Sequence, residues 1–230
     1  MKRFFLMLFI FTLWGAIGHA QRAYNEGIYI VVDAVGLPEA AVKTKSEVLN
    51  GTLDENGRVY RHQVTEGHGG NPNVNAKVSP RFALAPEDVP CSYIDSNSGP
   101  VVNAMRVNWM VASGWEDESG DFNTNPSADL QDTGCYAYRG PDGNDTPGTW
   151  RLPTQREFML IWILRDKLYS LNGMIPFTSH QYWTSTEAEI RAGWASAYYM
   201  TFNANDIMYP GPKKDNLTNN YVRCIKDLVD

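Results

Sequence analysis

The chain has 230 residues and a formal net charge of −6 at pH 7. This acidic balance argues against nucleic acid as a partner, because phosphates require a basic protein face, and against electrostatic binding to anionic lipid. The length allows one large domain or two small ones, and the composition is that of a globular protein rich in aromatic residues.

The first twenty residues have the three-part pattern of a secretory signal peptide. Lys2 and Arg3 precede an apolar run over residues 4–17, and small residues follow it up to Ala20. We therefore expect cleavage after Ala20 and export. A membrane anchor is the alternative, but the run is short for a span, so we expect no membrane span in the mature chain. That chain has 18 basic and 26 acidic residues, a net charge of −8.

Residues 21–88 are predicted to form a β-rich N-terminal region. Residues 27–32 are β-branched and aromatic, which favours a buried strand. Residues 58–64 alternate between apolar and polar, as in a half-exposed strand, and Asn56-Gly57 before them is a turn signal. Residues 38–48 favour a short helix that begins after a proline.

Residues 89–230 are predicted to form a second, helix-containing region. Thr154 and Glu157 have capping-box spacing, and apolar residues follow at helical spacing over 158–168. A second helix is expected over residues 101–112. All tryptophans of the mature chain lie in this region: Trp109, Trp115, Trp150, Trp162, Trp183 and Trp194.

Three apolar and aromatic runs near the C-terminus favour strands, over residues 182–184, 197–202 and 221–225. Helices followed by strands in one compact unit indicate an α+β domain.

Three words of the sequence carry a resemblance to a known family: WRLPT at 150–154 followed by Glu157, YWTST at 182–186, and VRCIKD at 222–227. In this order they resemble the Fibrobacter succinogenes major paralogous domain family. These are exported proteins of Bacteroides-like bacteria, and many are associated with the cell surface or with fimbriae. The family is related to the C-type-lectin-like fold, so the resemblance implies such a domain over residues 89–230, with two helices and a twisted antiparallel sheet.

The chain contains three cysteines, Cys91, Cys135 and Cys224, and an exported protein is expected to form a disulfide. The sequence itself leaves the pairing open. The resemblance implies Cys135–Cys224, because cysteines of the first helix and last strand pair in that fold, and it leaves Cys91 without a role. His62 and His68 are too loosely spaced to indicate a metal site, and we expect no cofactor.

Calcium is not expected to take part in binding. The chain lacks the Glu-Pro-Asn or Gln-Pro-Asp loop and the Trp-Asn-Asp strand of calcium-dependent lectins, and residues 203–206 are the nearest cluster. The acidic loops at 116–121 and 141–145 lack the ligand order of an EF-hand, so we expect them to be solvated.

The residues of the family words are expected to be structural rather than catalytic. Trp150, Leu152 and Trp183 suit the core, and Arg151 suits an ion pair. Glu157 is most simply a helix cap, not a general acid. Ser185 lies in no nucleophile motif, so no catalytic residue is predicted and the protein is not expected to be an enzyme.

The segment 194–209 is the best candidate for a ligand-binding surface, because tyrosine, serine and asparagine make adaptable contacts. Core packing is the alternative for each of its members. The predicted ligand-binding residues are Trp194, Ser196, Tyr198, Asn203, Asn205, Asp206 and Tyr209.

These observations favour an exported binding or adhesion protein, at the cell surface or on a fimbria, that recognises a glycan or protein without calcium. One alternative is a structural subunit of a surface assembly that docks through a strand centred on Tyr29. The other is an enzyme, because the formylglycine-generating enzymes have a related fold and use reactive thiols.

Overall fold

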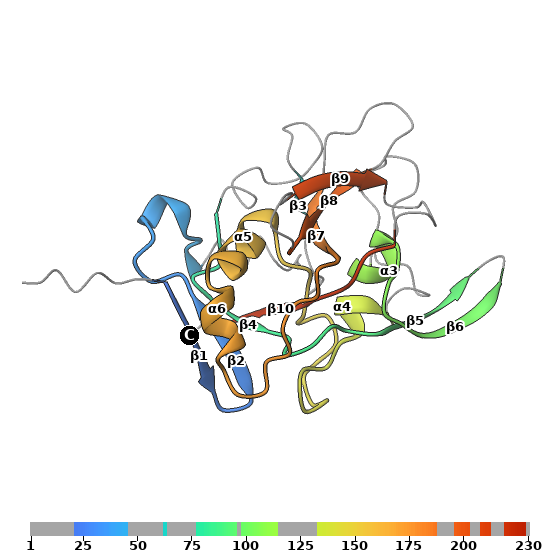
Figure 1. The fold of residues 1–230 in the computed structure, drawn as a ribbon, viewed down its shortest axis with the longest axis horizontal. Coiled ribbons are helices and arrows are strands. Elements are labelled where there is room, and N and C mark those ends of the chain that lie inside the picture. The colour runs from blue at the N-terminus through green and yellow to red at the C-terminus, as the bar shows by residue number, and fades with distance from the viewer. Residues whose placement is uncertain are drawn as a thin grey trace, which may run out of the picture.

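A computed structural model of the chain (Figure 1) is an α+β structure with mostly antiparallel sheets and few helices. The α+β class is therefore confirmed. The structure describes residues 21–45, 62–63, 77–95, 98–114, 133–187, 196–202, 208–212 and 219–228.

The first sheet has the strand order β1-β2-β4-β10. β1 (Arg22–Glu26) and β2 (Tyr29–Asp33) form a hairpin with a two-residue turn, in which Gly27 has a φ of 57°. Gly27 suits this turn because glycine has no Cβ to oppose a positive φ. The strand predicted over residues 27–32 is confirmed, and β2 is buried because its side chains pack into the core, where Ile30 and Val32 belong to one cluster.

Both ends of the described chain contribute to this sheet. β4 (Arg81–Leu84) pairs with β2 on one side and with β10 (Ile225–Asp227) on the other. Three strands of residues 21–88, namely β1, β2 and β4, therefore share one sheet with the last described strand, β10. The predicted strand at 221–225 begins only at Ile225, because Tyr221 makes an isolated bridge to Tyr182 instead.

The second sheet has the strand order β3-β7-β8-β9. β7 (Gln181–Glu187) and β8 (Ser196–Thr201) confirm two predicted strands, and β9 (Met208–Pro212) pairs with β8. β3 (His62–Gln63) runs parallel to β7. It is the described part of the strand predicted over 58–64, and the preceding turn lies outside the described residues.

Helix α5 (Gln155–Ile163) begins with the predicted capping box: the Thr154 hydroxyl accepts from the Glu157 amide, and the Glu157 carboxylate accepts from the Thr154 amide. The helix is shorter than expected. At Leu164 the backbone leaves helical geometry, with ψ of 3°, and α6 (Arg165–Tyr169) follows.

The helix predicted over residues 101–112 is wrong in its first half. β6 (Gly99–Ala104) pairs there with β5 (Cys91–Asp95), and α3 (Trp109–Ser113) starts only after the Asn108 side chain accepts from the Val111 amide. Two adjacent valines favour a strand, and an asparagine favours a helix start. Two other helices are also short: α4 (Gly134–Ala137), and the 3₁₀ turn η1 (Glu39–Ala41) in the described part of the helix predicted over 38–48.

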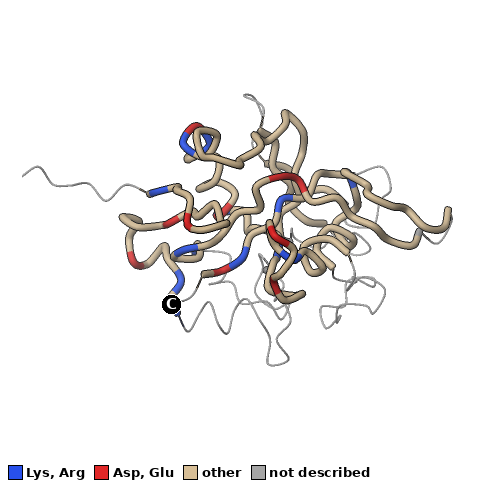
Figure 2. Tube along the Cα trace, turned by 90° about the horizontal axis from the view of Figure 1, so that it is seen from below, with Lys and Arg blue, Asp and Glu red and all other residues tan. Residues whose placement is uncertain are grey.

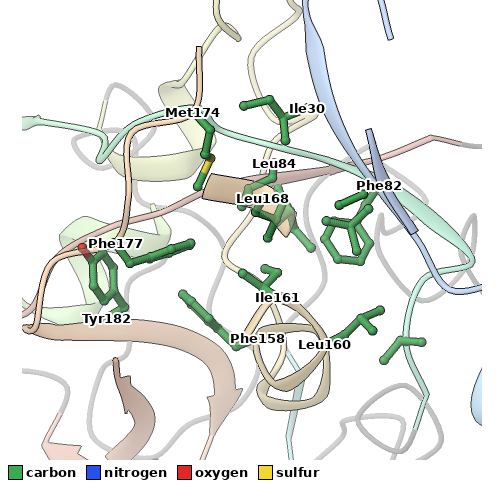
Figure 3. Packing of buried hydrophobic residues seen from close by; sticks show 14 of the residues in the cluster. Ile30, Phe82, Leu84, Phe158, Leu160, Ile161, Leu168, Met174, Phe177 and Tyr182 are labelled. Carbon is green, nitrogen blue, oxygen red and sulfur yellow. The ribbon is translucent and has the colours of Figure 1, made fainter. Parts of the chain in front are cut away.

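The core consists of two clusters on either side of the first sheet. One contains the buried rings of Trp109, Trp150 and Trp183 and the disulfide Cys135–Cys224, which confirms the predicted pairing. The other packs α5 and α6 against the first sheet (Figure 3). Its members include Ile30, Phe82, Leu84, Phe158, Leu160, Ile161, Leu168, Met174, Phe177 and Tyr182.

Candidate binding surface

The structure describes only three of the seven predicted ligand-binding residues. Ser196 and Tyr198 lie on β8, and Tyr209 lies on β9. The other four lie outside the described residues: Trp194, Asn203, Asn205 and Asp206.

The strand register places Tyr209 on a different face of the sheet from Ser196 and Tyr198. Tyr198 is opposite Pro210 on β9, whereas Tyr209 is opposite Tyr199 on β8. Since successive side chains of a strand point to opposite faces, Ser196 and Tyr198 share one face of the sheet and Tyr209 lies on the other. The predicted residues therefore do not form one surface.

Tyr199 is the partner of Tyr209 on its face, and the prediction missed it. Its ring lies 6.1 Å from that of Tyr209 and 5.9 Å from that of Trp183. We call Trp183, Tyr199 and Tyr209 the aromatic row. It runs from a fully buried ring to one that is 41% exposed, and partial burial raises the pKa of Tyr199. Only the pairing of β8 with β9 reveals the row.

The inner end of the aromatic row is fixed by hydrogen bonds. The Trp183 indole donates to the Val107 carbonyl, at 2.8 Å, and the Trp109 indole donates to the Thr184 carbonyl, also at 2.8 Å. The Thr184 hydroxyl donates to the Tyr198 carbonyl. These bonds join α3, β7 and β8, so the exposed tyrosine extends from a rigid support.

A buried ion cluster lies at the start of α5 and contains Lys43, Arg151, Glu157 and Asp227. Arg151 donates to both oxygens of Glu157, at 2.7 and 2.8 Å, and to both oxygens of Asp227, at 2.8 and 2.9 Å. Lys43 lies 3.4 Å from Glu157. The predicted ion pair of Arg151 is confirmed, and two positive charges balance two negative ones.

The surroundings of the ion cluster indicate a structural role. Glu157 also accepts hydrogen bonds from the backbone amides of Ser79 and Thr154. It therefore links the residues just before β4 to the start of α5. Burial lowers the pKa of Lys43. Burial alone would raise the pKa of Asp227, but the charge and hydrogen bonds of Arg151 lower it. All four side chains are buried, so they are out of reach of a ligand.

The acidic loop at 141–145 was predicted to be solvated, but one of its carboxylates is held by hydrogen bonds. Asp145 accepts hydrogen bonds from Tyr29, from the Trp150 indole and from Lys226. Burial alone would raise the pKa of Asp145, but these three bonds lower it. The loop at 116–121 lies outside the described residues. Within the described ranges, no group of three or more histidine, cysteine or acidic residues is placed to hold a metal ion.

The structure also describes the residues on which the two alternative functions depend, namely the cysteine thiol for an enzyme and the Tyr29 strand for a structural subunit. Cys91 is a free cysteine, and burial raises the pKa of its thiol to about 12. The strand that contains Tyr29 is paired on both sides, with β1 and with β4. The strand therefore has no open edge in the single chain.

Comparison of the chain with protein-family models and with curated proteins finds no match. In the part of the chain that the structure describes, no helix has the length and apolar character to cross a membrane.

Proposed function

We propose that the protein is an exported, surface-displayed or fimbria-associated binding protein that recognises a glycan without calcium. The observation that carries this proposal is the aromatic row, whose outermost ring, Tyr209, lies exposed on a supported sheet. Aromatic rings stack on the C–H faces of sugars, and tyrosine loses little conformational entropy on binding. A protein ligand is the second outcome that the experiment below distinguishes.

The family resemblance and the C-type-lectin-like fold belong to the same proposal. They are supported by the structural positions of the residues in the three family words. Trp150 and Trp183 are core residues, Arg151 and Glu157 form a buried pair, and Cys224 is in the disulfide. A disulfide is favoured in exported proteins, so it also supports export.

The test is a glycan array, with host surface proteins on the same slide, probed with the purified protein in calcium and in chelator. We expect a glycan hit that survives the chelator and is lost in Tyr209→Ala and weakened in Tyr199→Ala. Tyr198→Ala is the matched control, since it removes the same side chain from the opposite face of β8. Loss in the control but not in Tyr209→Ala would overturn the assigned face. A clean negative with folded protein would overturn glycan binding.

The enzyme alternative is disfavoured by the state of the cysteines. Two are joined in the disulfide, and the third is buried with a raised pKa, whereas thiolate chemistry requires an accessible thiol of low pKa. Titration of the native protein with a thiol reagent at pH 8 is expected to give no rapid reaction. Two reactive thiols would restore the enzyme hypothesis.

A further inference from the structure

The turn that follows helix α6 contains the dipeptide Asn172-Gly173. The Met174 amide donates to the Leu171 carbonyl at 3.3 Å, so Asn172 and Gly173 occupy the two corners of the turn. Gly173 has a φ of 81°, a conformation that glycine adopts without strain. Because glycine lacks a Cβ, its backbone nitrogen is also open to the side chain that precedes it.

Asparagine is one of the chemically labile residues, and its side-chain amide reacts with the backbone nitrogen of the next residue. In this turn, the Gly173 nitrogen loses its proton and bonds to Cγ of Asn172. The bond from Cγ to Nδ2 breaks, and Nδ2 takes up a proton from solvent and leaves as ammonia. A water molecule then opens the succinimide ring. Opening at Cγ gives aspartate, whereas opening at the backbone carbonyl carbon gives isoaspartate.

Three features of the turn leave this reaction open. Asn172 and Gly173 are both exposed. A Cβ added to Gly173 would meet no atom within 4 Å, so no neighbour crowds the reacting backbone. In the part of the chain that the structure describes, neither the Asn172 side chain nor the Gly173 amide has a hydrogen-bond partner. The two reacting groups are therefore not held apart by other bonds.

Another exposed asparagine, Asn144, is in the opposite situation. The nitrogen that would attack its side chain belongs to Asp145, and it already donates to the Arg139 carbonyl at 2.9 Å. The Asn144 side chain donates to the Asp142 carboxylate at 3.0 Å. Both reacting groups are thus engaged, so Asn144 is expected to stay intact in the folded protein and provides an internal reference.

We propose that Asn172 is a site of spontaneous deamidation, and that the folded turn protects it little compared with the unfolded chain. Water is the co-reactant, and no enzyme takes part. The reaction is independent of glycan binding. It is also independent of the assignment of the aromatic row, which lies on the other sheet.

The product alters a contact of the first sheet. The side chain of Asn25, on β1, donates to the Asn172 carbonyl at 3.0 Å, and the turn lies beside the β1–β2 hairpin in Figure 1. In isoaspartate the main chain runs through the side chain and is one atom longer, and the former carbonyl becomes part of a carboxylate. The bond from Asn25 therefore cannot keep its geometry.

The segment after the turn is also affected. The Ile175 carbonyl accepts from the buried guanidinium of Arg223 at 3.1 Å, and a longer main chain at position 172 shifts this carbonyl. Each product adds one negative charge. Acidic and basic residues are interspersed along the described chain in Figure 2, so the electrostatic effect of one added carboxylate is local. The modified protein is therefore expected to unfold at a lower urea concentration.

The experiment is peptide mapping by mass spectrometry, on purified protein incubated at pH 9 in native buffer and in urea. A methyltransferase that recognises isoaspartate counts that product. We expect the rate at Asn172 in native buffer to lie within about tenfold of the rate in urea, since an exposed turn gives little protection. The rate should fall at pH 6, because the nucleophile is the deprotonated nitrogen. The peptide that contains Asn144 should stay unmodified in native buffer.

Variants separate the chemistry from its effect on the fold. Asn172→Gln should abolish the reaction, because glutamine would have to close a larger ring. Gly173→Ala should slow it by about tenfold or more in urea, where a Cβ crowds the nitrogen without straining a folded turn. Asn172→Asp has the product's charge without its longer main chain, so the isoaspartate fraction of aged protein should unfold at a lower urea concentration than this variant.

The rates in the folded protein decide the matter. A native rate at Asn172 about a hundredfold or more below the rate in urea would overturn the proposal, because the turn would then be protective. Equal native rates at Asn172 and Asn144 would overturn it as well, since the hydrogen bonds of the second site would make no difference. An unmodified Asn172 peptide after prolonged incubation would have the same meaning.

Discussion

The sheet β1-β2-β4-β10 and the sheet β3-β7-β8-β9 differ in what covers their strands. In the first sheet, Ile30, Val32 and Phe82 face one core cluster, and Ala83 faces the other. In the second sheet, the edge strand β9 contains two prolines and an exposed tyrosine. A sheet buried on both faces contributes stability, whereas a sheet with a partly open face offers side chains to a partner. The first sheet therefore suits the role of a scaffold, and the second is where we propose that recognition takes place.

Loss of the disulfide is expected to have the largest effect on the scaffold. Cys135 and Cys224 are 89 residues apart, and closing a loop of this size contributes about 4–5 kcal/mol in the chain-entropy model. The double substitution to alanine should lower the free energy of unfolding by a similar amount, measured by urea denaturation. Cys91→Ala is the control and should cost about 1 kcal/mol, since a small buried side chain is shortened. Equal losses in both would contradict this assignment.

Breaking the ion cluster is the next largest effect. Glu157→Gln keeps the size of the side chain but leaves Arg151 and Lys43 with one carboxylate instead of two. Removing one partner of a buried pair costs about 3–5 kcal/mol, so the same urea measurement should show a loss of this size. The neighbouring Arg156→Gln lies on the exposed side of α5 and should change stability by under about 0.5 kcal/mol. A loss below about 1 kcal/mol in Glu157→Gln would show that the cluster is dispensable.

The ion cluster also predicts a pH dependence. The pKa of Asp227 is lowered in the folded protein, so its stabilising contribution is present above the unfolded pKa of about 3.9 and is lost as the pH falls through the lower folded value. Unfolding free energies measured from pH 6 to pH 2 should decline in the wild type. In Asp227→Asn the decline should be shallower, so the two curves should approach each other in acid. Parallel curves would mean that another carboxylate governs acid unfolding.

Tyr209→Ala should have the smallest effect on stability and the largest on binding. The side chain is 41% exposed at an edge strand, so its truncation should cost under about 1 kcal/mol. Phe82→Ala, which empties a buried position of the first sheet, should cost about 3–5 kcal/mol in the same urea measurement. Similar losses at the two positions would remove the distinction between scaffold and recognition sheet.

Local signals in the sequence were sufficient where neighbouring residues decide the structure. The capping box at Thr154 and Glu157 and the strand at β2 depend on residues within one turn or one strand. The helix predicted over 101–112 failed because its spacing fitted a helix while the valines at 101 and 102 favour a strand, which the pairing with β5 stabilises. The disulfide followed from the family resemblance, since spacing by itself left three pairings open.

The candidate surfaces depended on contacts between distant parts of the chain. Tyr199 meets Tyr209 through the register of β8 and β9, and Arg151 meets Asp227 across 76 residues. A cavity of about 610 Å³ beside α5 is lined by Leu37 and Met208, which come from opposite ends of the described chain.

The sequence by itself determined the acidic charge, the α+β class and the aromatic core, because these depend on composition and on short-range periodicity. The tertiary structure decided which tyrosine is exposed, which acids pair with Arg151, and which distant residues line the cavity beside α5. The physical reason is that a side chain's environment is set by the strands and helices packed against it, and those partners are separated from it by many residues.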